Sequence, residues 1–399
     1  MDERNHGQRP ARMWYRPMVA RRPDEPYRTV TPLELLFDLC FVVAVRQTGD
    51  HLHHNLAETD IGQGIGVYPA VFFAIWWAWM NFTTFASAYD PGDDVYRLTT
   101  LVQIAGALVL AAGVPRAFDR GDFSVITYGY VIMRLAMVAH WLRAARSDPE
   151  RRATTLRYAL GVSVLQVAWV ARLALPDRWL LPGFAGIAIA ELLLPFWARR
   201  PGPITWHPRH IVERFGLFTI IVLGEAVLAA SLAVQAAFDE GSHLGSLLSI
   251  AAASLVIVFA LWWLYFDRPT HELLTSPRVA LLWGYGQYFI FASAAAVGAG
   301  LAVAVDYETR TAHLGRLAVG YATAIPVAVY LLAVWVLHIR PYHRGWITVP
   351  YAGTIVLVLL APFTPAPVHL VALLVVALVA MTVVAPGGRM EVRRGAAQR

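Results

Sequence analysis

The sequence contains no lysine and a single cysteine, and charged side chains make up only 15% of its 399 residues. Soluble domains carry about 25% charged residues, so this shortage argues against a soluble globular protein. Cys40 stands alone, which excludes an intrachain disulfide and leaves no thiolate metal site. The chain also carries no P-loop, GxGxxG turn, zinc-protease motif or nucleophile elbow. We therefore expect no cofactor and no metal. These absences also favour a non-enzymatic protein over an enzyme.

Apolar side chains account for 57% of the residues, and the mean hydropathy is +0.51. They gather in runs of about 18–25 residues, long enough to cross a hydrocarbon core about 30 Å thick. Because the backbone must satisfy its own hydrogen bonds in lipid, these runs predict helices. The sequence thus predicts an all-α, polytopic integral membrane protein with about twelve transmembrane helices. The expected spans are 32–50, 67–88, 98–114, 123–142, 155–174, 179–198, 211–236, 244–266, 279–305, 315–338, 346–362 and 368–386.

The arginines are concentrated in the two tails and in alternate loops between the expected spans. Positive residues collect on the cytoplasmic side of short loops, so the pattern places both termini in the cytoplasm. On this reading 1–30 is an Arg-rich cytoplasmic tail and 387–399 a second one. The formal net charge of +6 then reflects orientation and attraction to anionic lipid. We expect the lipid bilayer, and no nucleic acid, as a partner.

Three segments of the first half recur in the same order in the second half. The matched pairs are 37–47 with 215–225, 76–81 with 262–267, and Gln103 with Gln287. With six expected spans in each half, the matches predict two parallel repeats, related by an axis along the membrane normal. The predicted repeats cover 31–200 and 201–386. Transporters and two-repeat channels are both built in this way.

Ionisable and polar side chains inside the expected spans are candidates for a solute or ion pathway. A charge at the centre of a span costs about 2.5–3.5 kcal/mol on insertion scales, so such residues are rare and often functional. Glu225 is the leading candidate because it lies in the middle of an apolar run, and Asp38 follows it. Glu34 and Asp38 are four residues apart and share one helix face. The full pathway set is Glu34, Asp38, Arg46, Gln103, Arg134, Glu225 and Gln287.

A second set of residues is expected to have structural or gating roles, because most of its members lie near span ends. Charged side chains there can cap a helix or extend to the interface, an alternative that also applies to Glu34. Arg134 can likewise be a structural partner of Glu191 or of Glu225. The tryptophans at 76–79 and 262–263 are read as interface belts or packing residues rather than as a cation site. The set comprises Asn81, Glu213, Arg214, Asp267, Trp76 and Trp262.

Several of these segments carry a resemblance to a known family. They are Val30–Leu39, Val43–Gln47, Trp76–Trp79 and, most closely, the Glu213-Arg214-Phe215-Gly216 motif followed by Leu223-Gly224-Glu225. They resemble the bacterial low temperature requirement protein A family over roughly 30–340. The resemblance implies a multi-pass protein of the bacterial cytoplasmic (inner) membrane, and it implies no particular substrate. Gln287 stands where many relatives carry histidine, so proton coupling in this chain is expected to differ if that histidine carries protons.

The leading functional hypothesis is a transporter or permease for an unidentified small solute or ion. A proton-coupled transporter is one version of this hypothesis. A two-repeat ion channel is an alternative, since Phe37-Asp38 is similar to the Phe-Ser-Asp motif of two-repeat potassium/proton channels. A membrane-embedded enzyme and a scaffold that adjusts the state of the lipid also stay open. The sequence permits a homo-oligomer without requiring one.

Overall fold

The computed structural model describes residues 14–21, 29–58, 61–205, 207–240, 244–312, 314–341 and 348–384. These residues form twelve α-helices and four short helical turns, with no strand among them. The all-helical prediction is therefore confirmed for this part of the chain, whereas the predicted tail 387–399 and most of the tail 1–30 lie outside the described residues. The helices are α1 (Pro32–Ala57), α2 (Ile61–Ala88), α3 (Asp94–Arg120), α4 (Ser124–Ser147), α5 (Arg152–Arg172), α6 (Asp177–Ala198), α7 (Pro208–Glu240), α8 (Leu244–Phe266), α9 (Pro277–Glu308), α10 (Arg316–Val334), α11 (Thr348–Leu360) and α12 (Pro367–Val384). The short turns are η1 (Pro149–Arg151), η2 (Thr270–Leu273), η3 (Trp335–Ile339, a π-helix) and η4 (Ala361–Phe363).

Nine of the described helices are long and apolar enough to cross a membrane. Each of the twelve expected spans coincides with a helix, but three of these helices differ from the rest. α1 carries several charged residues along its length, α5 is less apolar than the spans that qualify, and α11 is short. The helices thus fit a multi-pass membrane protein, and the number twelve stays a prediction.

The chain divides into two compact units, each of which is built from two separate segments of the sequence. Unit 1 comprises Met1–Gln47 and Ala70–Arg214, and unit 2 comprises Thr48–Pro69 and Phe215–Arg399. The three matched sequence pairs lie on α1 and α7, on α2 and α8 (with Asp267 just past the end of α8), and on α3 and α9. This placement keeps the order that a repeat requires, while the repeats themselves and their limits stay a prediction.

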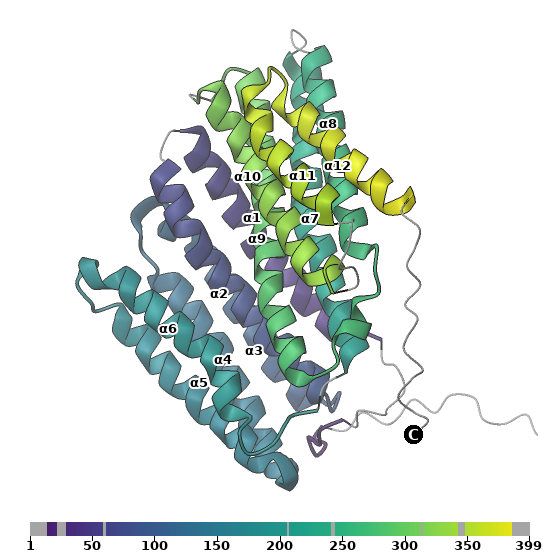
Figure 1. Ribbon diagram of the computed structural model, residues 1–399. Helices are drawn as coiled ribbons and strands as arrows, with labels where there is room; N and C mark the ends of the chain where they lie inside the picture. Colours follow the sequence, from purple (N-terminus) through teal and green to yellow (C-terminus); the bar gives the residue numbers. More distant parts are fainter. Residues whose placement is uncertain are drawn as a thin grey trace, which may run out of the picture. The chain divides into compact units, whose positions relative to one another are not determined.

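In unit 1, the helices α3 to α6 pack in sequence order, each against the next (Figure 1). Short connections between them make neighbouring helices antiparallel. The contact of α3 with α4 is especially close at Gly129, where an added Cβ would lie 2.3 Å from the backbone nitrogen of Leu110. Small residues allow helix backbones to approach in this way within a membrane.

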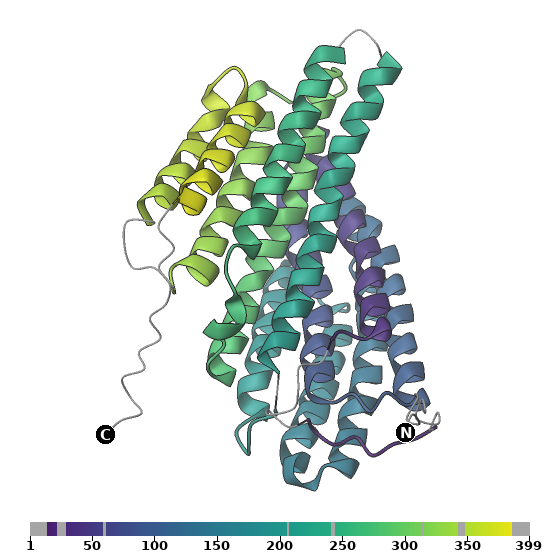
Figure 2. The same cartoon turned by 90° about the vertical axis from the view of Figure 1, so that its right-hand side faces the viewer.

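In unit 2, α10 packs against both α9 and α11, and α12 lies beside α8 and α11 (Figure 2). A Cβ added to Gly300 of α9 would lie 2.1 Å from the carbonyl oxygen of Ala322 in α10. The segment 48–69 also belongs to this unit, and it makes polar contacts with α9. His53 Nε2 lies 2.6 Å from Asp306 Oδ2, and the Tyr68 hydroxyl donates to the carbonyl of Ala292 at 2.6 Å.

An extended segment, 14–21, is held against the ends of helices in unit 1. The backbone nitrogen of Arg16 donates to Asp93 at 2.6 Å, and that of Ala20 donates to Asp148 at 3.3 Å. Arg143 pairs with Asp93 and donates to the carbonyl of Arg16 at 2.7 Å. Asp93 also caps α3 through the nitrogen of Tyr96 at 2.8 Å. Burial raises the pKa of the Asp93 carboxyl, but these hydrogen bonds outweigh it and hold the pKa below its ordinary value.

Candidate functional site

Unit 1 contains a buried group of polar side chains that we name the Arg214 cluster: Glu34, Asp38, Trp79, His210 and Arg214. None of the five is more than 1% exposed. They come from the first turns of α1, the middle of α2 and the first turns of α7. Ionisable groups this deep in helices of a membrane protein are uncommon, because each must find partners away from water.

Arg214 joins α1 to α7 by contacting two carboxylates. Its Nη2 lies 2.5 Å from Asp38 Oδ1, and its Nη1 lies 3.3 Å from Glu34 Oε1. Glu34 and Asp38 are one helical turn apart on α1, so both face the same neighbour, as their spacing predicts. One guanidinium therefore serves two carboxylates.

Aromatic side chains complete the surroundings of Asp38. Trp79 donates its indole N–H to Asp38 Oδ1 at 2.7 Å. The Arg214 guanidinium lies 6.0 Å from the ring centre of Trp79 and 5.7 Å from that of Phe82. Attraction between charges is stronger in such a low-dielectric setting than in water. The Asp38–Arg214 pair is thus held in one orientation by an aromatic wall.

Glu34 has a second, local role at the start of α1. Its Oε2 accepts hydrogen bonds at 2.8 Å from both the backbone nitrogen and the hydroxyl of Thr31, and the Glu34 nitrogen donates back to that hydroxyl at 3.3 Å. This is a capping box, with Pro32 at the first helical position. His210 Nε2 lies 3.3 Å from the other oxygen of Glu34. The capping alternative for Glu34 is therefore observed, and its pathway role stays a prediction.

A second buried group in unit 1, the Glu191 cluster, surrounds one carboxylate with four donors. Arg134 and Trp77 (2.8 Å) both donate to Oε2, whereas Tyr130 (3.1 Å) and Trp169 (3.3 Å) donate to Oε1. Four donors occupy the accepting capacity of a carboxylate. Of the two partners expected for Arg134, the structure thus selects Glu191. The saturated carboxylate indicates a rigid structural element.

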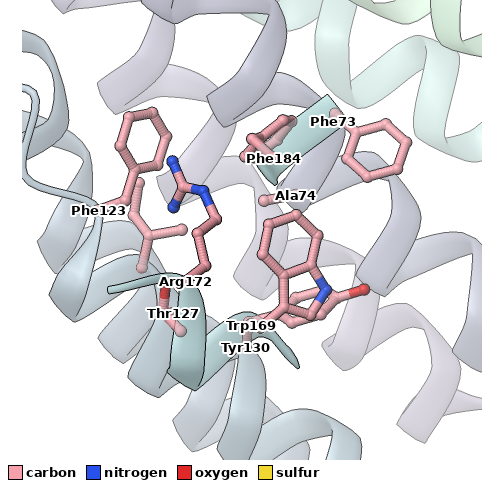
Figure 3. Close-up of a pocket in the computed structure, with 9 residues that line it drawn as sticks. Phe73, Ala74, Phe123, Thr127, Tyr130, Trp169, Arg172 and Phe184 are labelled. Carbon is pink, nitrogen blue, oxygen red and sulfur yellow. The ribbon is translucent and has the colours of Figure 1, made fainter. Parts of the chain in front are cut away.

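A pocket adjoins the Glu191 cluster, and Arg172 extends into it (Figure 3). Tyr130 and Trp169 belong to both features, so they connect the pocket to the buried carboxylate. Phe123 and Phe184 flank the Arg172 guanidinium, each with its ring centre 5.3 Å away. The remaining lining residues are Phe73, Ala74, Ile126 and Thr127.

Gln287, a predicted pathway residue, lies in a separate buried network in unit 2. Its Oε1 accepts from the Tyr265 hydroxyl at 3.1 Å, and its Nε2 lies 2.9 Å from His338 Nε2. Since an amide nitrogen can only donate, His338 Nε2 is the acceptor in that contact. His338 Nδ1 then carries the proton and donates to the carbonyl of Tyr265 at 3.3 Å. His338 lies within the π-helix η3, a distortion found frequently at functional sites.

The other predicted residues are spread over the two units. Arg46 is exposed on α1, Glu225 is half-buried on α7, and Gln103 is buried on α3. Asn81 donates to the carbonyl of Trp77 on its own helix at 2.7 Å, and Asp267 pairs with its neighbour Arg268 at 3.0 Å. The rest of the set comprises Glu213, which is half-buried, Trp76, which is buried, and Trp262, which is 44% exposed.

The structure brings Asp38, Glu34 and Arg214 together, and it adds residues that the predicted set lacked. His210 and Trp79 complete the Arg214 cluster, and Arg172 marks the pocket. Helical spacing cannot find them, because it relates residues on one helix and not on two. Thr31-Pro32-Leu33-Glu34, in contrast, is a readable capping-box signal. Among the described residues no group of three or more His, Cys, Asp or Glu side chains could hold a metal ion.

Comparison with known proteins gives one family and one relative. The sequence model of the family described as "Bacterial low temperature requirement A protein (LtrA)" matches residues 29–385. A curated protein of Rhizobium meliloti (strain 1021), described only as uncharacterized, is 26% identical over 249 residues. That match covers 58% of this chain and 57% of the relative, so the chain spans little more than half the length of that protein. No solved structure matches the chain.

Proposed function

We propose that this chain, which belongs to the bacterial low temperature requirement A protein family, transports a small solute or ion. The long apolar helices of the chain are those of a multi-pass membrane protein. The transport is coupled to protons, and the Arg214 cluster is where the coupling occurs. The family description names a growth requirement and no substrate, so the proposal rests on the site.

One observation carries the proposal: two carboxylates share one guanidinium at a depth where all three groups are at most 1% exposed. Ionisable residues buried among membrane helices mark solute and proton pathways. They also pair with one another, and a purely structural pair needs only one carboxylate for each arginine. The additional carboxylate is the feature that supports proton uptake and release at this cluster rather than a purely structural role.

The surplus carboxylate gives the cluster two stable charge states. When Asp38 takes up a proton, Glu34 still neutralises Arg214, so no buried arginine is left without a counter-charge. Loss of the Asp38 charge weakens the link between α1 and α7, because that link is the shorter of the two contacts. A change of proton occupancy thereby becomes a change in helix contact, which is what a coupled transporter requires.

The experiment is ion flux in liposomes that contain the purified protein and a trapped pH dye. Gradients of potassium, sodium and protons are imposed in turn on the wild type, on Asp38→Asn and on Glu225→Gln, the leading sequence candidate. The expected result is a flux that Asp38→Asn abolishes, because asparagine cannot take up or release the proton. Asp306→Asn is the matched control, since it removes a carboxyl that pairs with His53 in unit 2.

Full flux in Asp38→Asn contradicts the mechanism. A wild type that is silent in every gradient contradicts coupling to these ions. Where flux is found, its form separates two classes of protein. Flux that saturates with concentration supports a carrier, and single-channel currents support the ion channel instead.

A further inference from the structure

An exposed groove of unit 1 runs between α3 and α4 and has no part in the function proposed above. The hollow measures about 370 Å³, many times the space that one water molecule needs. It is open on its outer side, because three of its lining residues are about half exposed. The lining is apolar apart from one threonine hydroxyl, and it consists of Leu98, Thr99 and Val102 of α3 with Ile132, Leu135 and Ala136 of α4.

The extended segment 14–21 lies at one end of this groove. Val95 of α3 lies one turn before the lining residues of that helix, and its backbone nitrogen donates to the carbonyl of Trp14 at 3.4 Å. Arg143 of α4 lies two turns beyond Ala136 on the same face. Its guanidinium lies 4.5 Å from the ring centre of Tyr15. The two helix faces that line the groove therefore both lead to the segment 14–21.

The residues at this end of the groove are those of a membrane interface. Trp14 is 64% exposed and Tyr15 is 47% exposed. Tryptophan and tyrosine are enriched where the hydrocarbon core meets the head groups. Arg97 stands next to Leu98, and its side chain is 47% exposed. Its contact with Asp94 at 3.8 Å is an exposed ion pair of small energetic value, so the guanidinium can turn to another anion.

We propose that the groove holds one acyl chain of an anionic phospholipid, with the head group beside Arg97. The apolar lining accepts the chain. A phosphate oxygen of the head group accepts hydrogen bonds from the Arg97 guanidinium. Trp14 and Tyr15 present their polar tips at the level of the head group. Arg143 is already bound to Asp93, so the phosphate is assigned to Arg97.

Charge and side-chain size favour a lipid over a second copy of the chain as the occupant. α3 and α4 are long apolar helices of a multi-pass membrane protein, so their exposed faces meet acyl chains. Interfaces between membrane helices are enriched in small residues that let the backbones approach. This groove is walled mostly by larger aliphatic side chains. The arginine at its end attracts an anionic head group.

Photoaffinity labelling in nanodiscs tests the proposal. The nanodiscs consist of phosphatidylcholine with a small fraction of phosphatidylglycerol that carries a diazirine on one acyl chain. The neutral counterpart is phosphatidylcholine with the same diazirine. Labelled peptides are mapped by mass spectrometry. The readout is the label in 98–102 and 132–136 divided by the label in 179–189 of α6, which also carries exposed apolar side chains. This ratio corrects for lipids that merely surround the protein.

We expect the ratio to be about fivefold higher for the phosphatidylglycerol probe than for the phosphatidylcholine probe, the factor expected for one arginine beside an anionic head group. Arg97→Gln should remove this difference. Arg97→Lys should retain most of it, because the charge is kept. Arg120→Gln is the matched control, since it removes an exposed arginine at the other end of α3 and should behave like the wild type.

A second pair of variants tests the groove itself. Val102→Trp fills the groove from a half-exposed position and should lower the ratio for the phosphatidylglycerol probe several-fold. Leu108→Trp places the same side chain at a comparably exposed position of α3 outside the groove, and it should leave the ratio unchanged. Both side chains point away from the core, so neither change should disturb the packing of α3 against α4.

Equal ratios for the two probes, an unchanged ratio in Val102→Trp, or an undiminished difference in Arg97→Gln would overturn the proposal. Absence of label from both groove segments would also overturn it, and it would point to a second copy of the chain as the occupant. The readout is lipid binding, so it does not depend on whether the protein transports ions.

Discussion

Replacement of Glu191 by glutamine should strongly destabilise unit 1. The side chain keeps its size, but one of its oxygens becomes an NH₂ group that cannot accept hydrogen bonds. Oε1 and Oε2 each accept two hydrogen bonds, so either orientation of the amide leaves two donors without an acceptor. It also leaves the charge of Arg134 buried with no counter-charge in direct contact.

The magnitude follows from the cost of breaking a buried ion pair. Removing one partner of such a pair destabilises a protein by about 3–5 kcal/mol, because the other charge stays buried. Arg134→Met should have an effect of the same order. The double variant should be less destabilised than the sum of the two, by about 1–3 kcal/mol, since neither charge is then left alone.

Reversible unfolding in mixed micelles, followed by helicity, measures all four proteins of this cycle under one condition. A Glu191→Gln protein within about 1 kcal/mol of the wild type would refute the reasoning. Additive single effects would also refute it, because they would mean that Arg134 and Glu191 do not act as a pair.

Three further predictions concern other parts of the chain. Gly129→Ala should lower the free energy of unfolding by about 1–3 kcal/mol in the same assay, because the added Cβ has no room against α3. Gly66→Ala is the control: a Cβ there has nothing within 4 Å, so the change should be neutral or slightly stabilising. Equal effects of the two substitutions would contradict the close contact of α3 with α4. Trp79→Phe should lower stability by about 1.5–3 kcal/mol through loss of a hydrogen bond to a charged group, and an unchanged unfolding midpoint would contradict that contact. Because the pKa of Asp93 is lowered, its carboxylate stabilises the fold above about pH 4, and this contribution is lost as the pH falls through the lowered pKa. The unfolding temperature of Asp93→Asn should therefore fall less on acidification than that of the wild type. Parallel curves of unfolding temperature against pH would contradict the lowered pKa.

The helices could be predicted from the sequence because long apolar runs in lipid have almost no other structure available. The shared face of Glu34 and Asp38 followed from their spacing, and the pair of Arg134 with Glu191 was one of two alternatives. Arg214 was expected to have a structural or gating role because it lies near a span end. The structure buries Arg214 completely, since α7 begins at Pro208 and Arg214 contacts α1, while its structural or gating role stays a prediction.

The partners across helices could not be predicted in the same way. Trp79 looked like a packing residue because tryptophans are common near membrane interfaces, and only the position of α2 beside α1 brings its indole to Asp38. Arg172 stands at the end of an expected span, where an arginine is ordinarily solvated. Two aromatic rings flank its guanidinium, Phe123 just before α4 and Phe184 of α6, and neither is on the helix of Arg172.

The most direct test of the proposed function compares proton-driven flux in three proteins at matched reconstitution: the wild type, Asp38→Asn and Asp306→Asn. We predict that the wild type and Asp306→Asn acidify or alkalise the liposome interior alike, while Asp38→Asn does not, although it elutes as the same monodisperse species. Equal flux in Asp38→Asn and the wild type would contradict the assignment of coupling to the Arg214 cluster.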